Sequence, residues 1–506
     1  MSAKTPKNII LCADGTGNKG GYTPDSNVYK TYNGVDIHNE NTKQITYYDN
    51  GVGTSTNKIV KAISGAIGLG FKRNVRDLYE YLSMHYDEGD RVYLFGFSRG
   101  AATIRALLGF ISSCGLVKGK GLTTEKLKEY TEHAFKAYEK IDSDPDRAKQ
   151  FREHKNSHNI IEIQFVGVWD TVSALGLPDK IDDMGLLSRI LGSVFSILDS
   201  AINLVWTHHF YKYELTDNIQ HACQALALDD ARTTFWPKVW DENGREISTV
   251  EQVWFAGMHS NVGGGYERAG LSNVALEWML ERAKEHGLVF NSGFPEEQHQ
   301  SANVNGRLYD SRDGVGIFYR YHPREIEKLC ANKLKEKIKI HHTVFERLRY
   351  RTADYVMTHL PAELQIVHTD KNYKSRDVSF ADEKDWDISN EGVMRYVAIR
   401  KINYIIMLCF VVVLAVFFYL SDITGQEYIK ADGVLDKFAS LVFNNSPPII
   451  EYLVERTLLH YPVSTIIFLF SALAFWLFNM KVKRKIHCYG VKLRDIILFK
   501  LKQSGG

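Results

Sequence analysis

Residues 91–111 read RVYLFGFSRGAATIRALLGFI, and this stretch decides the fold. Its apolar beginning, residues 91–97, predicts a strand buried on both faces, and residues 101–111 predict a helix. The turn between them reads Gly-Phe-Ser-Arg-Gly, a G-x-S-x-G pattern centred on Ser98. Small residues beside a serine allow a sharp turn that raises the hydroxyl group above the sheet. We therefore predict that Ser98 is a nucleophile.

Four further runs of strand-forming residues accompany this stretch. Helix-like segments separate the runs, which predicts an open α/β fold with a mostly parallel sheet flanked by helices. The four runs are NIILCA (residues 8–13), ITYYD (45–49), IIEIQFVGVW (160–169) and VEQVWFAG (250–257). The segment HACQALAL, residues 221–228, is interpreted as helical. Together these elements predict a catalytic domain over residues 1–286.

A nucleophilic serine needs a histidine to take its proton and a carboxylate to hold that histidine. In this type of fold, the chain order is serine, acid, histidine. Asp170 ends the strand candidate at 160–169, and His259 follows the one at 250–257 beside a run of three glycines. We therefore predict Asp170 as the acid and His259 as the general base. Asp229 or Asp230 is the alternative acid, although a helix-end ion pair with Arg232 would also explain them.

The first strand candidate ends in a glycine-containing turn, Asp14-Gly15-Thr16-Gly17-Asn18. If this turn lies beside Ser98, the amides of Gly15 or Thr16 and of Arg99 would form an oxyanion hole. Asp14 cannot donate a hydrogen bond there as a carboxylate, so it would orient the turn or bind something else. A plain Asx turn is the alternative.

Composition excludes several other classes of protein. Lys and Arg number 62 against 60 Asp and Glu, a net charge of +2, so no overall field favours nucleic acid. The six cysteines are scattered without a CxxC pair, which argues against zinc and disulfide frameworks. Serine chemistry needs no cofactor, and we expect neither a cofactor nor a metal.

Two further regions lie within and after the predicted catalytic domain. Residues 184–206 have apolar residues at helical spacing, which predicts an amphipathic helix that is either a lid or an ordinary helix packed on the sheet. Residues 287–400 are polar and charged, include a helix candidate at 325–338, and are interpreted as an accessory region. No chemistry is apparent in that region.

Two uncharged apolar stretches, residues 402–420 and 463–480, are each long enough to predict a transmembrane helix. The alternative is a buried core helix. Basic residues before the first stretch and in the tail 481–506 predict that both termini and the catalytic domain are cytoplasmic, with loop 421–462 outside. The first residues lack the apolar stretch and small-residue cleavage site typical of a signal peptide, so we expect none. These features predict an integral protein of the bacterial inner membrane.

Four segments in order give the chain a family resemblance. They are the Asp14–Asn18 turn, the Ser98 elbow, Trp-Asp-Thr-Val at 169–172 and His-Ser-Asn-Val-Gly-Gly-Gly-Tyr at 259–266. The chain resembles, over about residues 7–357, the uncharacterised α/β-hydrolase domain family shared with type VI secretion phospholipase effectors. The resemblance implies hydrolysis of carboxylic esters, in characterised relatives of phospholipids. Ser98, Asp170 and His259 match the positions of the family's triad motifs.

These patterns predict a membrane-anchored lipase or phospholipase that forms an acyl-enzyme through a Ser-Asp-His triad. The expected partners are a lipid or other ester substrate and the bilayer itself. Two alternatives stay open at this point. One is an esterase or thioesterase for a soluble substrate, and the other is an anchored interaction or sensor protein on a hydrolase scaffold that does not turn over substrate.

Overall fold

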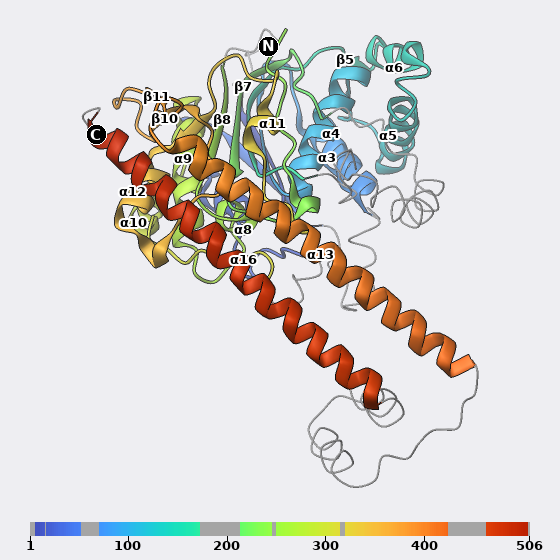
Figure 1. Cartoon of the computed structure of the whole chain (residues 1–506). Helices are drawn as coiled ribbons and strands as arrows, with labels where there is room; N and C mark the ends of the chain where they lie inside the picture. The colour runs from blue at the N-terminus through green and yellow to red at the C-terminus, as the bar shows by residue number, and fades with distance from the viewer. Residues whose placement is uncertain are drawn as a thin grey trace. The chain divides into compact units, whose positions relative to one another are not determined.

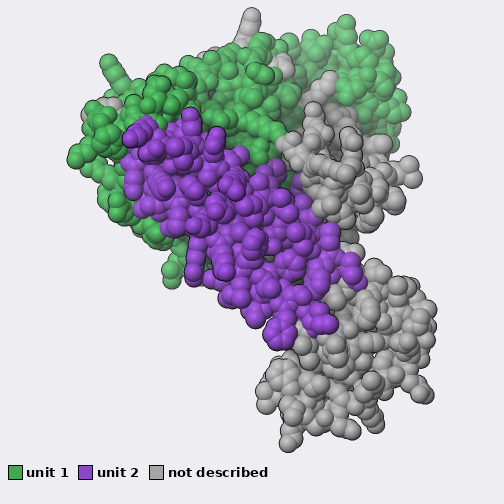
Figure 2. Space-filling model, in the orientation of Figure 1, with its two compact units in different colours: residues 1–319, 323–383, 498–506 green, residues 320–322, 384–497 purple. Residues whose placement is uncertain are grey.

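The computed structural model describes residues 6–15, 17–51, 70–172, 213–244, 249–313, 319–423 and 462–503. The chain divides into two compact units (Figure 2). The first comprises residues 1–319, 323–383 and 498–506, and the second comprises residues 320–322 and 384–497. The lid candidate at 184–206 lies outside the described residues.

Among the residues that the structure describes, nine strands form a sheet at the centre of the first unit, in the order β11-β10-β9-β8-β7-β6-β3-β1-β2. Every neighbouring pair is parallel except β10 and β11. The strands are β1 (Asn8–Ala13), β2 (Gln44–Asp49), β3 (Arg91–Phe97), β6 (Ile163–Trp169), β7 (Ile219–Ala227), β8 (Thr249–Phe255), β9 (Lys339–His341), β10 (Glu363–Val367) and β11 (Arg376–Ser379). A separate pair joins β4 (Leu116–Val117) and β5 (Ser157–His158). The predicted α/β fold with a mostly parallel sheet is confirmed.

Helices flank the sheet in the first unit (Figure 1). They are α1 (Asn27–Gly34), α3 (Phe71–His85), α4 (Arg99–Cys114), α5 (Thr124–Tyr138), α6 (Pro145–Arg152), α8 (His259–Gly263), α9 (Gly270–Glu285), α10 (Phe294–Ser301), α11 (Ile326–Cys330) and α12 (His342–Tyr350), with short 3₁₀ turns η1 (Thr233–Phe235) and η3 (Thr352–Asp354). Of the helix predicted at 325–338, only α11 forms.

Burial on both faces explains why the central strands are continuously apolar. Successive side chains of a strand point to opposite faces. Ile9 and Leu11 of β1 therefore pack in one core cluster, with α3, α4, α5 and α6, whereas Ile10 and Cys12 pack in a second cluster with α1 and α9. Each cluster excludes water from one face of the sheet, which stabilises it by the hydrophobic effect.

Two interpretations of the sequence are corrected by the sheet. Residues 219–227, interpreted as helical, form β7, which lies between β6 and β8. A central strand buried on both faces has no alternation, so its sequence resembles a buried helix. Region 287–400 supplies β9, β10 and β11, which extend the same sheet that carries Ser98. Because parallel strands end at one edge, the residues that follow β1, β3, β6, β7 and β8 gather there.

The second unit contains α13 (Trp386–Ile423) and α16 (Pro462–Gln503) as far as Ile497, and the two helices contact each other. Arg400 donates a hydrogen bond to Asn479, with 3.1 Å between Nε and Oδ1. The rings of Phe410 and Phe468 stack with centroids 5.9 Å apart. A Cβ atom on Gly392 would lie 2.3 Å from the ring of Tyr489, so glycine permits this close approach.

The two predicted transmembrane helices fall on α13 and α16, and this prediction is wrong. Within the described residues, neither helix has the length of apolar sequence needed to cross a membrane. Both helices continue beyond the apolar stretches into charged sequence, with Arg400 and Lys401 before the first stretch in α13 and Lys481 after the second in α16. The predicted integral placement in a bacterial inner membrane is overturned with it. Of the predicted outer loop 421–462, residues 424–461 lie outside the described part of the chain.

Candidate active site

Ser98 occupies a strained turn between β3 and α4. Its backbone has φ 58° and ψ −121°, a positive φ that non-glycine residues rarely adopt. The neighbouring glycines make this turn sterically feasible. A Cβ atom on Gly96 would lie 2.7 Å from Cα of Ala101, and one on Gly100 would lie 2.1 Å from the carbonyl oxygen of Ala13. The small residues of the motif thus let α4 begin directly against β1 and β3.

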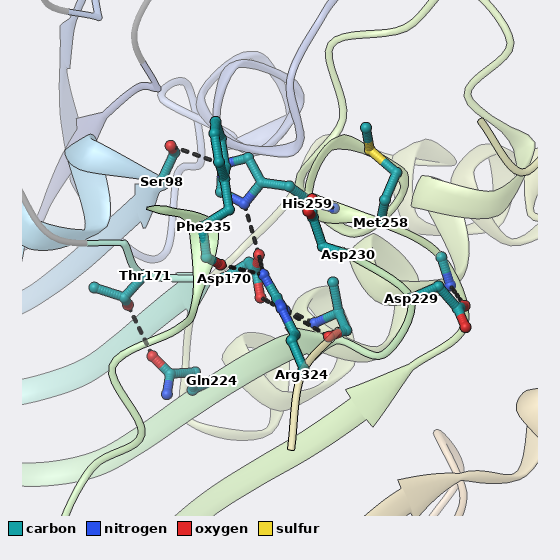
Figure 3. Close-up of polar contacts among 12 residues, drawn as sticks. Ser98, Asp170, Thr171, Gln224, Asp229, Asp230, Phe235, Met258, His259 and Arg324 are labelled. Carbon is teal, nitrogen blue, oxygen red and sulfur yellow. Dashed lines mark hydrogen bonds and ion pairs between the residues drawn. The ribbon is translucent and has the colours of Figure 1, made fainter. Parts of the chain in front are cut away.

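The structure brings Ser98, His259 and Asp170 into one chain of hydrogen bonds (Figure 3). Nε2 of His259 lies 2.7 Å from Oγ of Ser98, and Nδ1 lies 2.6 Å from Oδ2 of Asp170. The three residues follow β3, β8 and β6, respectively, and are at most 7% exposed. With the imidazole proton on Nδ1, Nε2 accepts the hydroxyl proton of Ser98. This is the arrangement that general-base activation of a serine requires.

The carboxylate of Asp170 has partners beyond His259. Its Oδ1 accepts a hydrogen bond from the amide of Ala227 at 3.0 Å. The guanidinium of Arg324 donates to both carboxylate oxygens, at 2.6 Å to Oδ1 and 2.7 Å to Oδ2. Both side chains of this ion pair are fully buried. Asp170 also has a positive φ of 43°, so its backbone is held in an uncommon conformation.

Burial and charge act in opposite directions on these groups. Burial alone would raise the pKa of Asp170, but the Arg324 charge and the hydrogen bond to His259 outweigh it, and the pKa is well below its ordinary value. Burial lowers the pKa of His259, although the hydrogen bond and charge of Asp170 oppose this. Asp170 is therefore ionised and His259 neutral near pH 7, as a general base must be.

The alternative acids, Asp229 and Asp230, support the backbone around His259. Asp229 accepts a hydrogen bond from the amide of Gly257 at 2.6 Å, and Asp230 accepts one from the amide of His259 at 3.2 Å. Asp230 also pairs with Arg232 at 2.6 Å, the ion pair considered as an alternative from the sequence. Because the imidazole hydrogen-bonds to Asp170, the geometry favours Asp170 over either neighbour as the acid.

The turn after β1 lies close to Ser98. A Cβ atom on Gly15 would be 3.2 Å from Cβ of Ser98. However, the Gly15 amide donates to Oδ1 of Asp14 at 2.6 Å, so this amide already has an acceptor. The carboxylate of Asp14 thus holds the backbone of the turn at Gly15. Thr16, the other candidate donor on this turn, lies outside the described residues, whereas Arg99 is the first residue of α4 and directly follows Ser98.

Sequence reasoning missed Arg324 entirely. The residue lies just before α11, in the region interpreted as accessory, and its partner Asp170 is 154 positions earlier. Nothing in its local sequence distinguishes it from neighbouring arginines such as Arg320, which is only partly buried. Two aromatic rings that contact His259 were also missed: Phe97, with ring centroids 4.7 Å apart, and Phe235, with centroids 5.0 Å apart.

Comparisons with known proteins give this site a family context. Residues 7–282 match the model of the type VI secretion phospholipase effector Tle1-like catalytic domain. The chain is 32% identical over 193 residues to the uncharacterised protein YEL023C of Saccharomyces cerevisiae, a match that covers 34% of this chain and 27% of that protein. The chain therefore spans about a quarter of that relative.

Two solved structures have detectable similarity. An uncharacterised protein from Pseudomonas aeruginosa is 16% identical with a TM-score of 0.35, covering 59% of this chain and 49% of that one. The Tle1 effector bound to the VgrG spike of the type VI secretion system is 14% identical with a TM-score of 0.31, covering 64% and 82%. The family model, which covers more than half of the chain and contains Ser98, Asp170 and His259, establishes that this protein belongs to the Tle1-like phospholipase effector family of hydrolases.

Proposed function

We propose that this protein is a serine ester hydrolase that cleaves acyl esters of phospholipids through an acyl-enzyme intermediate. The observation that carries the proposal is the hydrogen-bond chain from Ser98 through His259 to Asp170, located in a catalytic domain of a phospholipase family. Each residue type has the position that its role demands. The serine lies at the elbow, the neutral imidazole beside it, and the ionised carboxylate behind the imidazole.

The first half-reaction acylates Ser98. Nε2 of His259 takes the hydroxyl proton as Oγ of Ser98 forms a bond to the ester carbonyl carbon. The tetrahedral intermediate then collapses, the ester C–O bond breaks, and the imidazolium returns the proton to the leaving alkoxide, which departs as an alcohol. In the second half-reaction, His259 takes a proton from water, hydroxide adds to the acyl carbon, and Ser98 leaves with the proton restored.

Asp170 orients the imidazole and stabilises its cation. Loss of the corresponding carboxylate in serine proteases lowers kcat by about 10⁴ without disturbing the geometry. Negative charge on the carbonyl oxygen would be stabilised by the amide of Arg99 at the N-terminus of α4, where the dipoles of a 16-residue helix converge.

The substrate class follows from the family, whose model is that of a phospholipase effector catalytic domain. Purified protein is therefore offered both phosphatidylcholine vesicles and a p-nitrophenyl ester. Release of fatty acid from the vesicles is expected for the native protein and not for Ser98→Ala. Hydrolysis of the soluble ester alone would replace the phospholipase assignment with that of an esterase.

The control for this experiment is Ser113→Ala, a serine near the far end of the same helix α4. This variant should retain native activity. A fluorophosphonate probe should label the native protein and Ser113→Ala but not Ser98→Ala. If the native protein neither releases product nor takes up the probe, the protein is not a serine hydrolase and a scaffold without turnover is the better explanation.

A further inference from the structure

Arg324 donates to both oxygens of the Asp170 carboxylate, of which Oδ2 also contacts Nδ1 of His259 (Figure 3). Its two terminal nitrogens donate to one carboxylate oxygen each, a planar two-point contact that guanidinium makes well and ammonium cannot. The same nitrogens also donate to the carbonyl oxygens of Ala227 and Phe235. Arg324 thus joins the acid to the end of β7 and to η1.

This arrangement differs from a triad in which the acid carries an uncompensated charge. An unpaired carboxylate attracts the proton of the imidazolium that forms during catalysis. Here the buried guanidinium of Arg324 contacts both carboxylate oxygens. Its positive charge weakens the electrostatic stabilisation that Asp170 gives to the His259 imidazolium. The two-point contact also restricts rotation of the carboxylate, which directs Oδ2 toward Nδ1 of His259. Arg324 lies beyond residues 7–282, which match the family model.

We propose that Arg324 is a positioning residue of this active site, which holds Asp170 against His259 and determines the pH at which the site loses activity. The proposal rests on the serine hydrolase function proposed above. It makes a residue outside the recognised catalytic domain a requirement for efficient catalysis. Arg324 acts through Asp170 and need not touch the substrate.

Several charged groups face His259 and Asp170 and set the direction of the pH effect. The carboxylates of Asp170 and Asp230 favour the imidazolium, whereas the guanidinium of Arg232 disfavours it. Arg324 is a second positive charge, held against Asp170 and near Asp229 and Asp230. Arg232 lies 3.5 Å from the ring centroid of Phe235, which in turn contacts His259. Removal of Arg324 takes away one positive charge beside Asp170 and leaves Asp170 and Asp230 against the single guanidinium of Arg232. The pKa of His259 should therefore rise, and with it the pH below which activity is lost.

The test compares Arg324→Gln and Arg324→Lys with the native protein, using a neutral p-nitrophenyl ester over a range of pH. For Arg324→Gln, we expect kcat to fall about 100-fold, the effect of a modest misplacement of a catalytic group, with KM nearly unchanged. The acidic limb of kcat/KM should move to higher pH. Arg324→Lys keeps the charge but not the two-point contact, so its kcat should fall while its acidic limb stays in place.

Arg282→Gln is the matched control. Arg282 is also buried, pairs with Glu251 at 3.0 Å, and donates to the carbonyl oxygen of Thr369, but it does not contact the three active-site residues. This variant loses a buried ion pair and should be destabilised without any movement of the acidic limb. If Arg282→Gln and Arg324→Gln change the pH profile alike, Arg324 has only a structural role and the proposal is overturned.

A second measurement does not depend on turnover. Titration of ¹³C-labelled histidine by NMR, with His259→Gln to assign the resonance, should show His259 protonating at higher pH in Arg324→Gln than in the native protein. An unchanged titration overturns the proposal even where Ser98 still reacts with a fluorophosphonate. A shifted titration in a protein that never labels Ser98 would support the electrostatic role of Arg324 and reject the hydrolase function.

Discussion

The hydroxyl group of Tyr355 donates a hydrogen bond to Oδ2 of Asp229 at 2.9 Å, and the same oxygen accepts the amide of Gly257 at 2.6 Å. Gly257 has a φ of 116° and begins the turn that carries His259. A residue from the region after the family's catalytic domain thus supports the histidine turn through a buried carboxylate. Together with Arg324, it shows that residues beyond 282 contribute to the architecture of the site.

Asp229 should make the stability of the protein depend on pH. Burial raises its pKa to about 6, above the value of an unfolded carboxyl. The stability that protonated Asp229 contributes to the folded protein is therefore fully present below about pH 4 and is lost as the pH rises through about 6. Between pH 4 and 7, the free energy of unfolding measured in urea should fall by on the order of 2–3 kcal/mol more for the native protein than for Asp229→Asn. Parallel stability curves for the two proteins would contradict this.

Asp170 and Arg324 should be strongly coupled in stability. Asp170→Asn leaves the fully buried Arg324 without its ionic partner, which should cost about 3–5 kcal/mol. The double variant Asp170→Asn/Arg324→Gln removes both charges and should be less destabilised than the sum of the two single variants, although its activity stays low. Urea unfolding of the four proteins measures this coupling.

The pair of Glu251 and Arg282 provides the comparison for this cycle. Glu251 is 21% exposed at its side chain, so water compensates a lost partner better than it does at Asp170. The coupling measured from Glu251→Gln and Arg282→Gln should therefore be the smaller of the two. Equal coupling free energies for the two pairs would mean that full burial does not strengthen the interaction between Asp170 and Arg324.

Asp14 should be required for the turn beside Ser98. Its Oδ2 accepts hydrogen bonds from Ser26 at 2.5 Å and Tyr48 at 2.6 Å, and its Oδ1 accepts those of Gly15 and Asn18. The amide nitrogen of Asp14→Asn cannot accept, so buried donors lose a partner at a cost of about 1–3 kcal/mol. We expect lower stability in urea and a lower kcat, from displacement of the turn.

Tyr48→Phe is the control for Asp14→Asn, because it removes one of the four donors and leaves the carboxylate intact. It should cost less in both stability and kcat than Asp14→Asn. If both variants have the same urea midpoint of unfolding and the same kcat as the native protein, the turn does not depend on Asp14.

The local sequence was sufficient to predict those parts of the site whose structure depends on residues close together in the chain. The turn at Ser98 needs a strand before it, a helix after it and small residues around it, and all of these lie within residues 91–111. The strands β1, β2, β3, β6 and β8 were likewise predicted from short apolar runs. Strand β7 was not, because a strand buried on both faces lacks the period that separates strand from helix.

The apolar stretches near the C-terminus show a case in which a sequence pattern led to a wrong prediction. Hydropathy over 402–420 and 463–480 predicted two spans, but over the described residues neither α13 nor α16 meets the length and apolarity of a membrane-crossing helix. Composition alone does not specify what surrounds an apolar helix. In the structure, the rings of Phe410 and Phe475, one from each stretch, lie 5.8 Å apart.

The sequence by itself determined that this chain has an α/β sheet with a serine at a sharp turn, because strand, turn and helix are specified by residues close together in the chain. Only the tertiary structure decided the partners of that serine. Strand order and register bring the ends of β3, β6 and β8 to one edge of the sheet and leave Asp170, rather than Asp229 or Asp230, against the imidazole. The same folding carries Arg324 across 154 positions to Asp170, where it pairs with the buried carboxylate, and no local pattern specifies a partner so far away in the chain.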